Sequence, residues 1–269
     1  MPVVVSYFTD PCCPWSWALE PALRKLTWEF GENLSITYVM CGMAQQFGDP
    51  QPLIKQILAA AASSGMPVDV RLWLDSPLRS SHPACIAVKA AAEQGDPGRY
   101  LRRLREGILC RRAKLDGAEA LIAEARLIAG LDPERFRVDL SSHAILEAFG
   151  ADLERAKAVP AKYRGEGSDR VKVPSLEFRG AGGVSHGVYG FSDHPALRAA
   201  AAAAGAVPRR AAPPGVEEAL RHFGSMSTSE VAAVCDLPGP RAPAELWRLA
   251  SEWRVTAERL GSGELWTLA

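Results

Sequence analysis

The residues best suited to chemistry lie near the N-terminus, in the segment DPCCPWSW at positions 10–17. An unbroken apolar and β-branched run, Val3 to Phe8, precedes this segment, and a helical pattern follows Pro14. Cys13 is therefore expected at the end of a buried strand and the start of a helix, where backbone N–H groups point outward and the helix dipole is positive. Both effects favour a thiolate over a thiol. We expect a lowered pKa for Cys13 and a nucleophilic sulfur.

The residues after Cys13 fit this assignment. Pro14 suits a first helical turn because the N–H that it lacks would go unpaired there. Ser16 lies three residues after Cys13, so its hydroxyl can hydrogen-bond the thiolate. Trp15 is expected to be exposed beside the thiol, where it could contact a substrate, whereas Trp17 is expected in the core.

The other cysteines offer fewer roles. Six cysteines in 269 residues, with no CxxC pair, are too sparse for a disulfide scaffold or a zinc site. A disulfide between Cys12 and Cys13 would need a strained ring. Cys41 is the better auxiliary thiol, because it ends a second predicted strand at 35–40 and parallel strands end at one edge of a sheet. Buried, inert thiols are expected at Cys85, Cys110 and Cys235.

A soft-metal site is an alternative use of the same sulfurs. Cys12, Cys13 and Cys41, with Met40 and Met43 nearby, could bind Cu(I) or a similar ion. The simpler interpretation is that the sulfur-containing residues at positions 40, 41 and 43 pack in the core at the end of the strand.

The pattern of elements predicts an α/β fold. A strand at 3–8, a helix with apolar residues from Leu19 to Phe30 and a strand at 35–40 make a βαβ unit with parallel strands. Residues 52–160 read as an inserted set of helices. Strands return at 175–178 and 184–189, and a helix is expected at 193–204.

The remaining residues predict a separate C-terminal domain. A linker is expected at 205–215, followed by three helices and a terminal hairpin within 216–269. One helix is expected at 216–223, one with a Ser227–Glu230 capping box at its start, and one from Pro243 to Trp253. This order resembles a winged helix-turn-helix domain.

The segment DPCCPWSWALEP (10–21) resembles the active-site motif of the DsbA-like branch of the thioredoxin superfamily, in the group that includes FrnE and the ClpXP adaptor SpxH. Residues 80–95 and 100–110 resemble the helical insert of that group, and the likeness covers residues 1–204. It implies a thioredoxin-like fold with a large helical insertion. It also implies that Val173-Pro174 is the cis-proline loop, with Pro174 opposite Cys13 and the Val173 backbone free to pair with an extended substrate.

One departure from the family pattern concerns the second cysteine of the CxxC motif, which is Ser16 here. A CxxS motif can attack a disulfide, but the mixed disulfide then waits for an external thiol. The resemblance therefore implies a monothiol oxidoreductase that uses glutathione or another low-molecular-weight thiol. The motif also resembles that of kappa-class glutathione transferases and 2-hydroxychromene-2-carboxylate isomerases, in which case Ser16 would donate to glutathione and Cys13 would be incidental.

Composition and charge exclude some partners. The chain has 31 basic and 31 acidic side chains and no apolar run of 18 residues, so we expect no membrane contact and a cytoplasmic protein. Residues 205–269 hold seven arginines and eight acidic side chains, which favours a protein contact over DNA binding. Two hypotheses remain: a thiol-dependent enzyme acting on a protein or a small thiol or disulfide, and a non-enzymatic adaptor that holds a protein partner.

Overall fold

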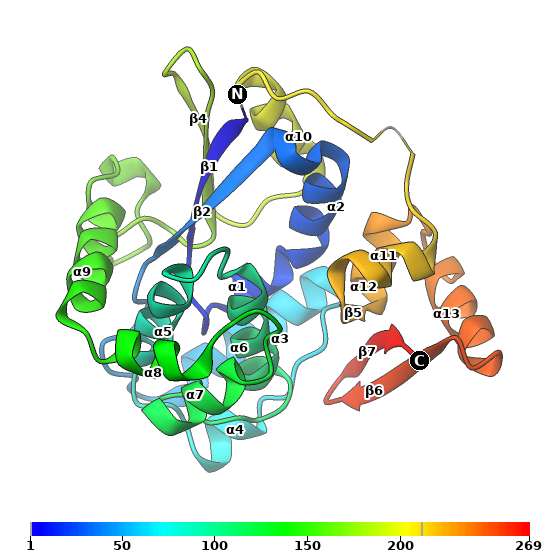
Figure 1. Cartoon of the computed structure of the whole chain (residues 1–269), viewed down its shortest axis with the longest axis horizontal. Helices are drawn as coiled ribbons and strands as arrows, with labels where there is room; N and C mark the ends of the chain where they lie inside the picture. Colours follow the sequence, from blue (N-terminus) through cyan, green and yellow to red (C-terminus); the bar gives the residue numbers. More distant parts are fainter. Residues whose placement is uncertain (1, 211) are drawn as a thin grey trace.

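The structure is a computed structural model that describes residues 2–210 and 212–269 (Figure 1). Position 1 of the predicted first domain and position 211 of the predicted linker lie outside the described residues. Among the described helices, none has the length and apolar character needed to cross a membrane.

A four-stranded mixed sheet positions the DPCCPWSW segment. Its strands are β1 (Val3–Thr9), β2 (Leu34–Met40), β3 (Ser175–Arg179) and β4 (Ser185–Tyr189), in the order β2-β1-β3-β4. β1 and β2 are parallel, as the sequence predicts, and the other two pairings are antiparallel. The parallel register pairs Thr9 with Met40, so the two chains leave the sheet at the same edge.

Helices cover both faces of this sheet (Figure 1). α2 (Glu20–Phe30) and α10 (His194–Ala203) share one apolar cluster with β1 and β3. On the other face, Phe8 and Val39 pack with residues at the end of α9 (His143–Lys157). Short 3-10 helices occupy Gly31–Asn33 and Ala161–Tyr163.

The helix that the sequence predicts after Pro14 is divided. α1 (Pro14–Ala18) ends before Leu19, and α2 begins at Glu20. The reason is Pro21, which has no N–H to donate to the carbonyl of the preceding turn and which lies in the first turn of α2.

The insertion between β2 and β3 is helical, as predicted. Besides α9 it consists of α3 (Pro50–Ser64), α4 (Arg71–Asp75), α5 (His82–Ala92), α6 (Gly98–Leu109), α7 (Ala118–Ala125) and α8 (Pro133–Leu140). These helices enclose the largest apolar cluster, which also takes in Leu260 and Leu265 from the C-terminal hairpin. The predicted α/β fold with a large helical insertion is confirmed.

The C-terminal residues form three helices and a three-stranded antiparallel sheet in the order β5-β7-β6. The elements are α11 (Val216–Phe223), β5 (Met226–Ser227), α12 (Thr228–Val234), α13 (Arg241–Ser251), β6 (Val255–Leu260) and β7 (Gly263–Leu268). The predicted capping box between Ser227 and Glu230 is present. The third helix begins at Arg241 and ends at Ser251, so both predicted ends of that helix were two residues late.

This C-terminal unit is firmly packed on the rest of the chain. Trp28 of α2 lies in its apolar core. The β6–β7 turn is bonded to the loop before α4, where Ser262 N donates to the Val68 carbonyl at 3.0 Å and Val68 N donates to Ser262 Oγ at 3.0 Å. A Cβ at Gly261 would lie 2.1 Å from that Val68 carbonyl oxygen, so the close approach requires glycine.

Candidate active site

Cys13 lies at the junction that the sequence indicates. It is the N-cap of α1, with Pro14 in the first helical turn. Its sulfur accepts a hydrogen bond from Ser16 N at 3.4 Å, which pairs one of the N–H groups left free at the helix start. Cys13 N donates to the Asp10 carbonyl at 3.2 Å and closes the turn between β1 and α1.

The expected lowering of the Cys13 pKa is wrong. The side chain is buried, at 1% exposure, and burial raises the pKa of the thiol because a thiolate there would lose its hydration. Hydrogen bonds from Ser16 lower the pKa and the nearby Asp10 raises it, but burial is the largest effect. The side chain is therefore a thiol at neutral pH, and it donates a long contact of 3.9 Å to the Val173 carbonyl.

The Val173–Pro174 segment lies opposite Cys13, immediately before β3. The peptide bond between Val173 and Pro174 is cis, Pro174 is buried and Val173 is half-buried. The Val173 carbonyl is already the acceptor for the Cys13 thiol. The structure thus brings together residues separated by 160 positions, which the spacing of the sequence alone does not relate.

The two tryptophans of the motif divide between surface and core. Trp15 is half-buried, and its ring lies 5.3 Å from that of Phe191 after β4. Phe191 is 39% exposed, and sequence reasoning missed it. Trp17 is in the core, as predicted, and its indole N–H donates to the Pro67 carbonyl at 2.9 Å. Trp15 and Phe191 thus form an aromatic pair beside the motif.

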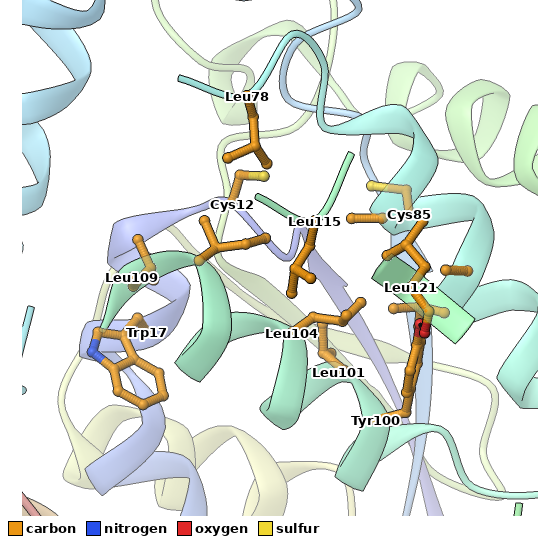
Figure 2. Close-up of a cluster of buried hydrophobic side chains, with 14 of the residues drawn as sticks. Cys12, Trp17, Leu78, Cys85, Tyr100, Leu101, Leu104, Leu109, Leu115 and Leu121 are labelled. Atoms are coloured by element: carbon orange, nitrogen blue, oxygen red, sulfur yellow. Dashed lines mark hydrogen bonds between the residues drawn. The ribbon is translucent and has the colours of Figure 1, made fainter. Parts of the chain in front are cut away.

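Cys12 and Cys41 are at the same sheet edge as Cys13, but their side chains pack in different clusters. Cys12 lies beside Leu78 in the core of the helical insertion (Figure 2). Cys41 packs with Phe8 and Val39. Burial raises the pKa of both thiols well above the ordinary value, and all six cysteines are free and buried. The burial predicted for Cys85, Cys110 and Cys235 is confirmed.

The structure does not support the soft-metal site that was the alternative use of Cys12, Cys13 and Cys41. Within residues 2–210 and 212–269, no group of three or more histidine, cysteine or acidic side chains is placed to hold a metal ion. The physical reason is the packing just described, because the side chain of Cys12 belongs to the insertion and that of Cys41 to the opposite face of the sheet. Met40 is fully buried in the insertion core, which favours the packing interpretation.

Asp10 is fully buried, and its carboxylate is bonded to several parts of the chain. Its carboxylate accepts hydrogen bonds from Cys12 N at 2.8 Å, Met43 N at 2.6 Å and Ser81 Oγ at 2.9 Å. The Cys85 thiol also donates to it at 3.3 Å. Burial raises the pKa of Asp10, and these hydrogen bonds oppose the rise. Asp10 thus ties the motif to α5.

A chain of hydrogen bonds leads from Ser16 into the protein. Thr9 Oγ1 donates to Ser16 Oγ at 2.8 Å and accepts a hydrogen bond from Arg105 Nη2 of α6. Arg105 is 1% exposed, and its other terminal nitrogen is bonded to Glu20 of α2. The serine that replaces the second cysteine is therefore fully buried and is linked through Thr9 to an arginine of the insertion.

The chain continues as a buried ion-pair network that reaches the C-terminal unit. Arg102 of α6 pairs with Glu20 at 3.5 Å and with Glu230 of α12 at 2.6 Å. Arg24 pairs with Glu230 at 3.1 Å. All of these side chains are at least nine-tenths buried. Ion pairs this deep hold their elements in one arrangement, because removal of either partner leaves a buried charge.

Sequence reasoning missed this network. A signal was available in YLRRLREGIL (100–109), where Arg102, Arg105 and Glu106 are spaced at three and four residues like the apolar positions of the same helix. Charged residues on a buried helix face need partners from other elements. Glu230 was assigned only to the capping box, which it also forms.

The comparisons with known proteins agree with this architecture. A family model described as Thioredoxin matches residues 7–163. The ClpXP adapter protein SpxH of Shouchella clausii is 30% identical over 98% of this chain and 88% of its own length. The chain belongs to the DsbA-like, SpxH-related branch of the thioredoxin family. The SpxH of Halalkalibacterium halodurans is 27% identical over the same shares, 98% and 88%.

The solved structures show the fold of this branch. A putative protein disulfide isomerase from Nitrosomonas europaea matches with a TM-score of 0.65 at 16% identity. The match covers 76% of this chain and 97% of that protein. The likeness to SpxH, in contrast, extends through the C-terminal unit, because it covers nearly the whole chain.

Proposed function

We propose that this protein is a non-enzymatic adaptor of the SpxH kind, which binds a protein substrate and presents it to a ClpXP protease. The observation that carries the proposal is the state of Cys13, which is 1% exposed and has a raised pKa. A disulfide exchange enzyme needs an accessible thiolate. The full-length likeness to proteins named ClpXP adapter supports a binding role instead.

We also propose that the chain consists of a thioredoxin-like domain at 1–204, a linker at 205–215 and a winged-helix-like domain at 216–269. The order of helices and strands in the last part supports the winged-helix likeness. The buried pairing of Glu230 with Arg102 supports a fixed orientation between the two domains. A fixed orientation suits an adaptor, since two partners bound to it are then held at one distance.

We further propose that the C-terminal domain contacts protein rather than DNA. Arg248, on α13, is neutralised by Glu245 at 2.8 Å and Glu252 at 2.5 Å. A helix that binds DNA needs free cations for the phosphates. The same domain exposes Trp247 and Trp253, at 57% and 86%, and tryptophan is enriched in protein interfaces.

A monothiol oxidoreductase is the second candidate. It is favoured by the Ser16 hydrogen bonds to Cys13 and by the Val173–Pro174 turn facing the sulfur. In that reaction the Cys13 thiolate attacks a disulfide RS–SR′ and forms a mixed disulfide with RS, while R′S⁻ leaves. A second thiolate, such as that of glutathione, then attacks the RS sulfur, forms a new disulfide with it and regenerates the Cys13 thiolate.

Reconstituted proteolysis separates the two candidates. Proteins that accumulate when the gene is deleted are purified and incubated with ClpXP and ATP, with or without this chain. The adaptor proposal predicts that the chain accelerates degradation of at least one of them about tenfold and that Cys13→Ser accelerates it equally. No acceleration, together with glutathione-dependent disulfide reduction that Cys13→Ser abolishes, would establish the enzyme instead.

A further inference from the structure

A large cleft lies away from Cys13, between the thioredoxin-like sheet, the insertion and the C-terminal unit. It has a volume of about 840 Å³ and is lined by residues of α2, β2, α6 and α11 and by Arg209 and Arg210. Figure 1 shows these elements around the centre of the molecule. The volume is in the range of small-molecule sites, typically about 300–1,000 Å³. Cys13 and Pro174 are not among the lining residues.

The wall of this cleft carries more positive than negative side chains. Six arginines line it, with three acidic residues. The inner arginines, Arg24, Arg102 and Arg105, are paired within the buried network, and Arg209 is paired with Glu32 at 2.6 Å. The remaining charges of the lining are those of Arg99 and Arg210 at the mouth and that of Asp96, which offsets one of them.

Neither of these two arginines has a carboxylate partner among residues 2–210 and 212–269. Arg210 Nη1 donates to the Trp28 carbonyl at 2.9 Å, and its guanidinium lies 4.3 Å from the centre of the Trp28 ring. Arg99 is exposed at the start of α6. Burial lowers the pKa of His222, which also lines the cleft, and the positive charges of Arg210 and Arg99 lower it further. The charges of both arginines therefore act on the same histidine ring.

One arginine of the cleft wall, Arg105, has a buried donor that lacks an acceptor. Arg105 is 1% exposed, and its Nε–H has no hydrogen-bond partner in the described part of the chain. A buried N–H of a charged group without an acceptor is costly. The Tyr38 hydroxyl also packs closely against the cleft wall, because a Cβ at Gly98 would lie only 2.5 Å from Tyr38 Oη. Residue 98 therefore keeps the hydroxyl of Tyr38 at the cleft wall.

We propose that this cleft binds a small anion that carries carboxylate or phosphate groups. Arg99 and Arg210 hold the anionic group at the mouth, where their guanidinium forks match the oxygens of either group. Since the lining residues come from three parts of the chain, the bound ligand bridges the thioredoxin-like sheet, the insertion and the C-terminal unit.

Isothermal titration at constant ionic strength tests this, with pyrophosphate as the phosphate probe and citrate as the carboxylate probe. We expect saturable binding of at least one probe with one molecule per chain. Each of Arg99→Gln and Arg210→Gln should raise its Kd about tenfold or more. Arg221→Gln, which removes a charge next to His222 but outside the lining, should leave the Kd unchanged.

Binding of pyrophosphate would indicate a ligand with phosphate groups, and binding of citrate would indicate a ligand with carboxylate groups. Binding of neither probe, or an equal loss of affinity in Arg221→Gln, would overturn the proposal. Arg99 forms no ion pair within the described residues, so Arg99→Gln should keep the melting temperature of the wild type and report binding alone. The test is independent of the adaptor proposal, because Cys13→Ser should bind the probes with unchanged Kd.

Discussion

Arg102 donates to both carboxylate oxygens of Glu230, at 2.6 and 3.0 Å, and so joins the helical insertion to the C-terminal unit. Glu230 is fully buried and also closes the capping box of α12 by accepting from Ser227 N at 2.6 Å. One side chain thus starts a helix and fixes that helix against two other parts of the chain.

Glu230→Gln should destabilise the protein by about 3–5 kcal/mol, because Arg24 and Arg102 would both lose a carboxylate partner in a buried network. Urea unfolding followed by circular dichroism measures this loss. Glu252→Gln is the matched control, since it breaks exposed pairs with Arg248 and Arg254 that contribute about 0–1 kcal/mol. Equal effects of the two variants would show that the buried network does not hold the units together.

The stability of the protein should fall in acid because of Glu106. Burial alone would raise the pKa of Glu106, but Arg102, Ser225 and Arg111 lower it to about 2. A folded-state pKa below the unfolded value, about 4.3, gives stability that is present above pH 4.3 and is lost as the pH falls toward 2. The contribution is on the order of 3 kcal/mol.

Unfolding free energies of the wild type and Glu106→Gln between pH 7 and pH 3 test this expectation. The wild type should lose stability below about pH 4.5, and the variant should begin less stable and change less over that range. Parallel curves for the two proteins would contradict the assignment to Glu106.

Restoring the second cysteine should restore a dithiol motif. Ser16 N donates to Cys13 Sγ at 3.4 Å, and Ser16 Oγ lies in the first turn of the same helix. Ser16→Cys is therefore expected to form a disulfide with Cys13 on mild oxidation, seen as the loss of two hydrogens by mass spectrometry. Ser16→Ala, which has no sulfur, is the control. Failure of the cysteine variant to form that bond would mean that the enclosure by Thr9 and Arg105 prevents it.

The sequence predicted a helix or strand correctly wherever the residues of that element alone formed a recognisable pattern. The run Val3 to Phe8, the Ser227–Glu230 capping box and the apolar helices of the insertion each depend on local periodicity, and the structure confirms them. The position of Cys13 between β1 and α1 was also predicted correctly, because a strand–helix junction can be recognised from its composition.

The failures concern properties that only packing determines. The pKa of Cys13 was predicted from the helix start alone, but burial under the Val173–Pro174 turn outweighs that effect. The soft-metal alternative is not supported, because Cys12 and Cys41 pack in different apolar clusters. Besides Glu106 of the same helix, Arg102 pairs with residues of α2 and α12, at sequence distances of 82 and 128 residues, which no local pattern encodes.

The alkylation rate of Cys13 as a function of pH is the most direct test of the account. Iodoacetamide labelling is followed on the Cys13 peptide by mass spectrometry, and Cys13→Ser identifies the background from the other cysteines. A buried thiol predicts slow labelling at pH 7 and a midpoint above the ordinary cysteine value of about 8.5. Rapid labelling at pH 7, with a midpoint below that value, would show an accessible thiolate and contradict the adaptor proposal.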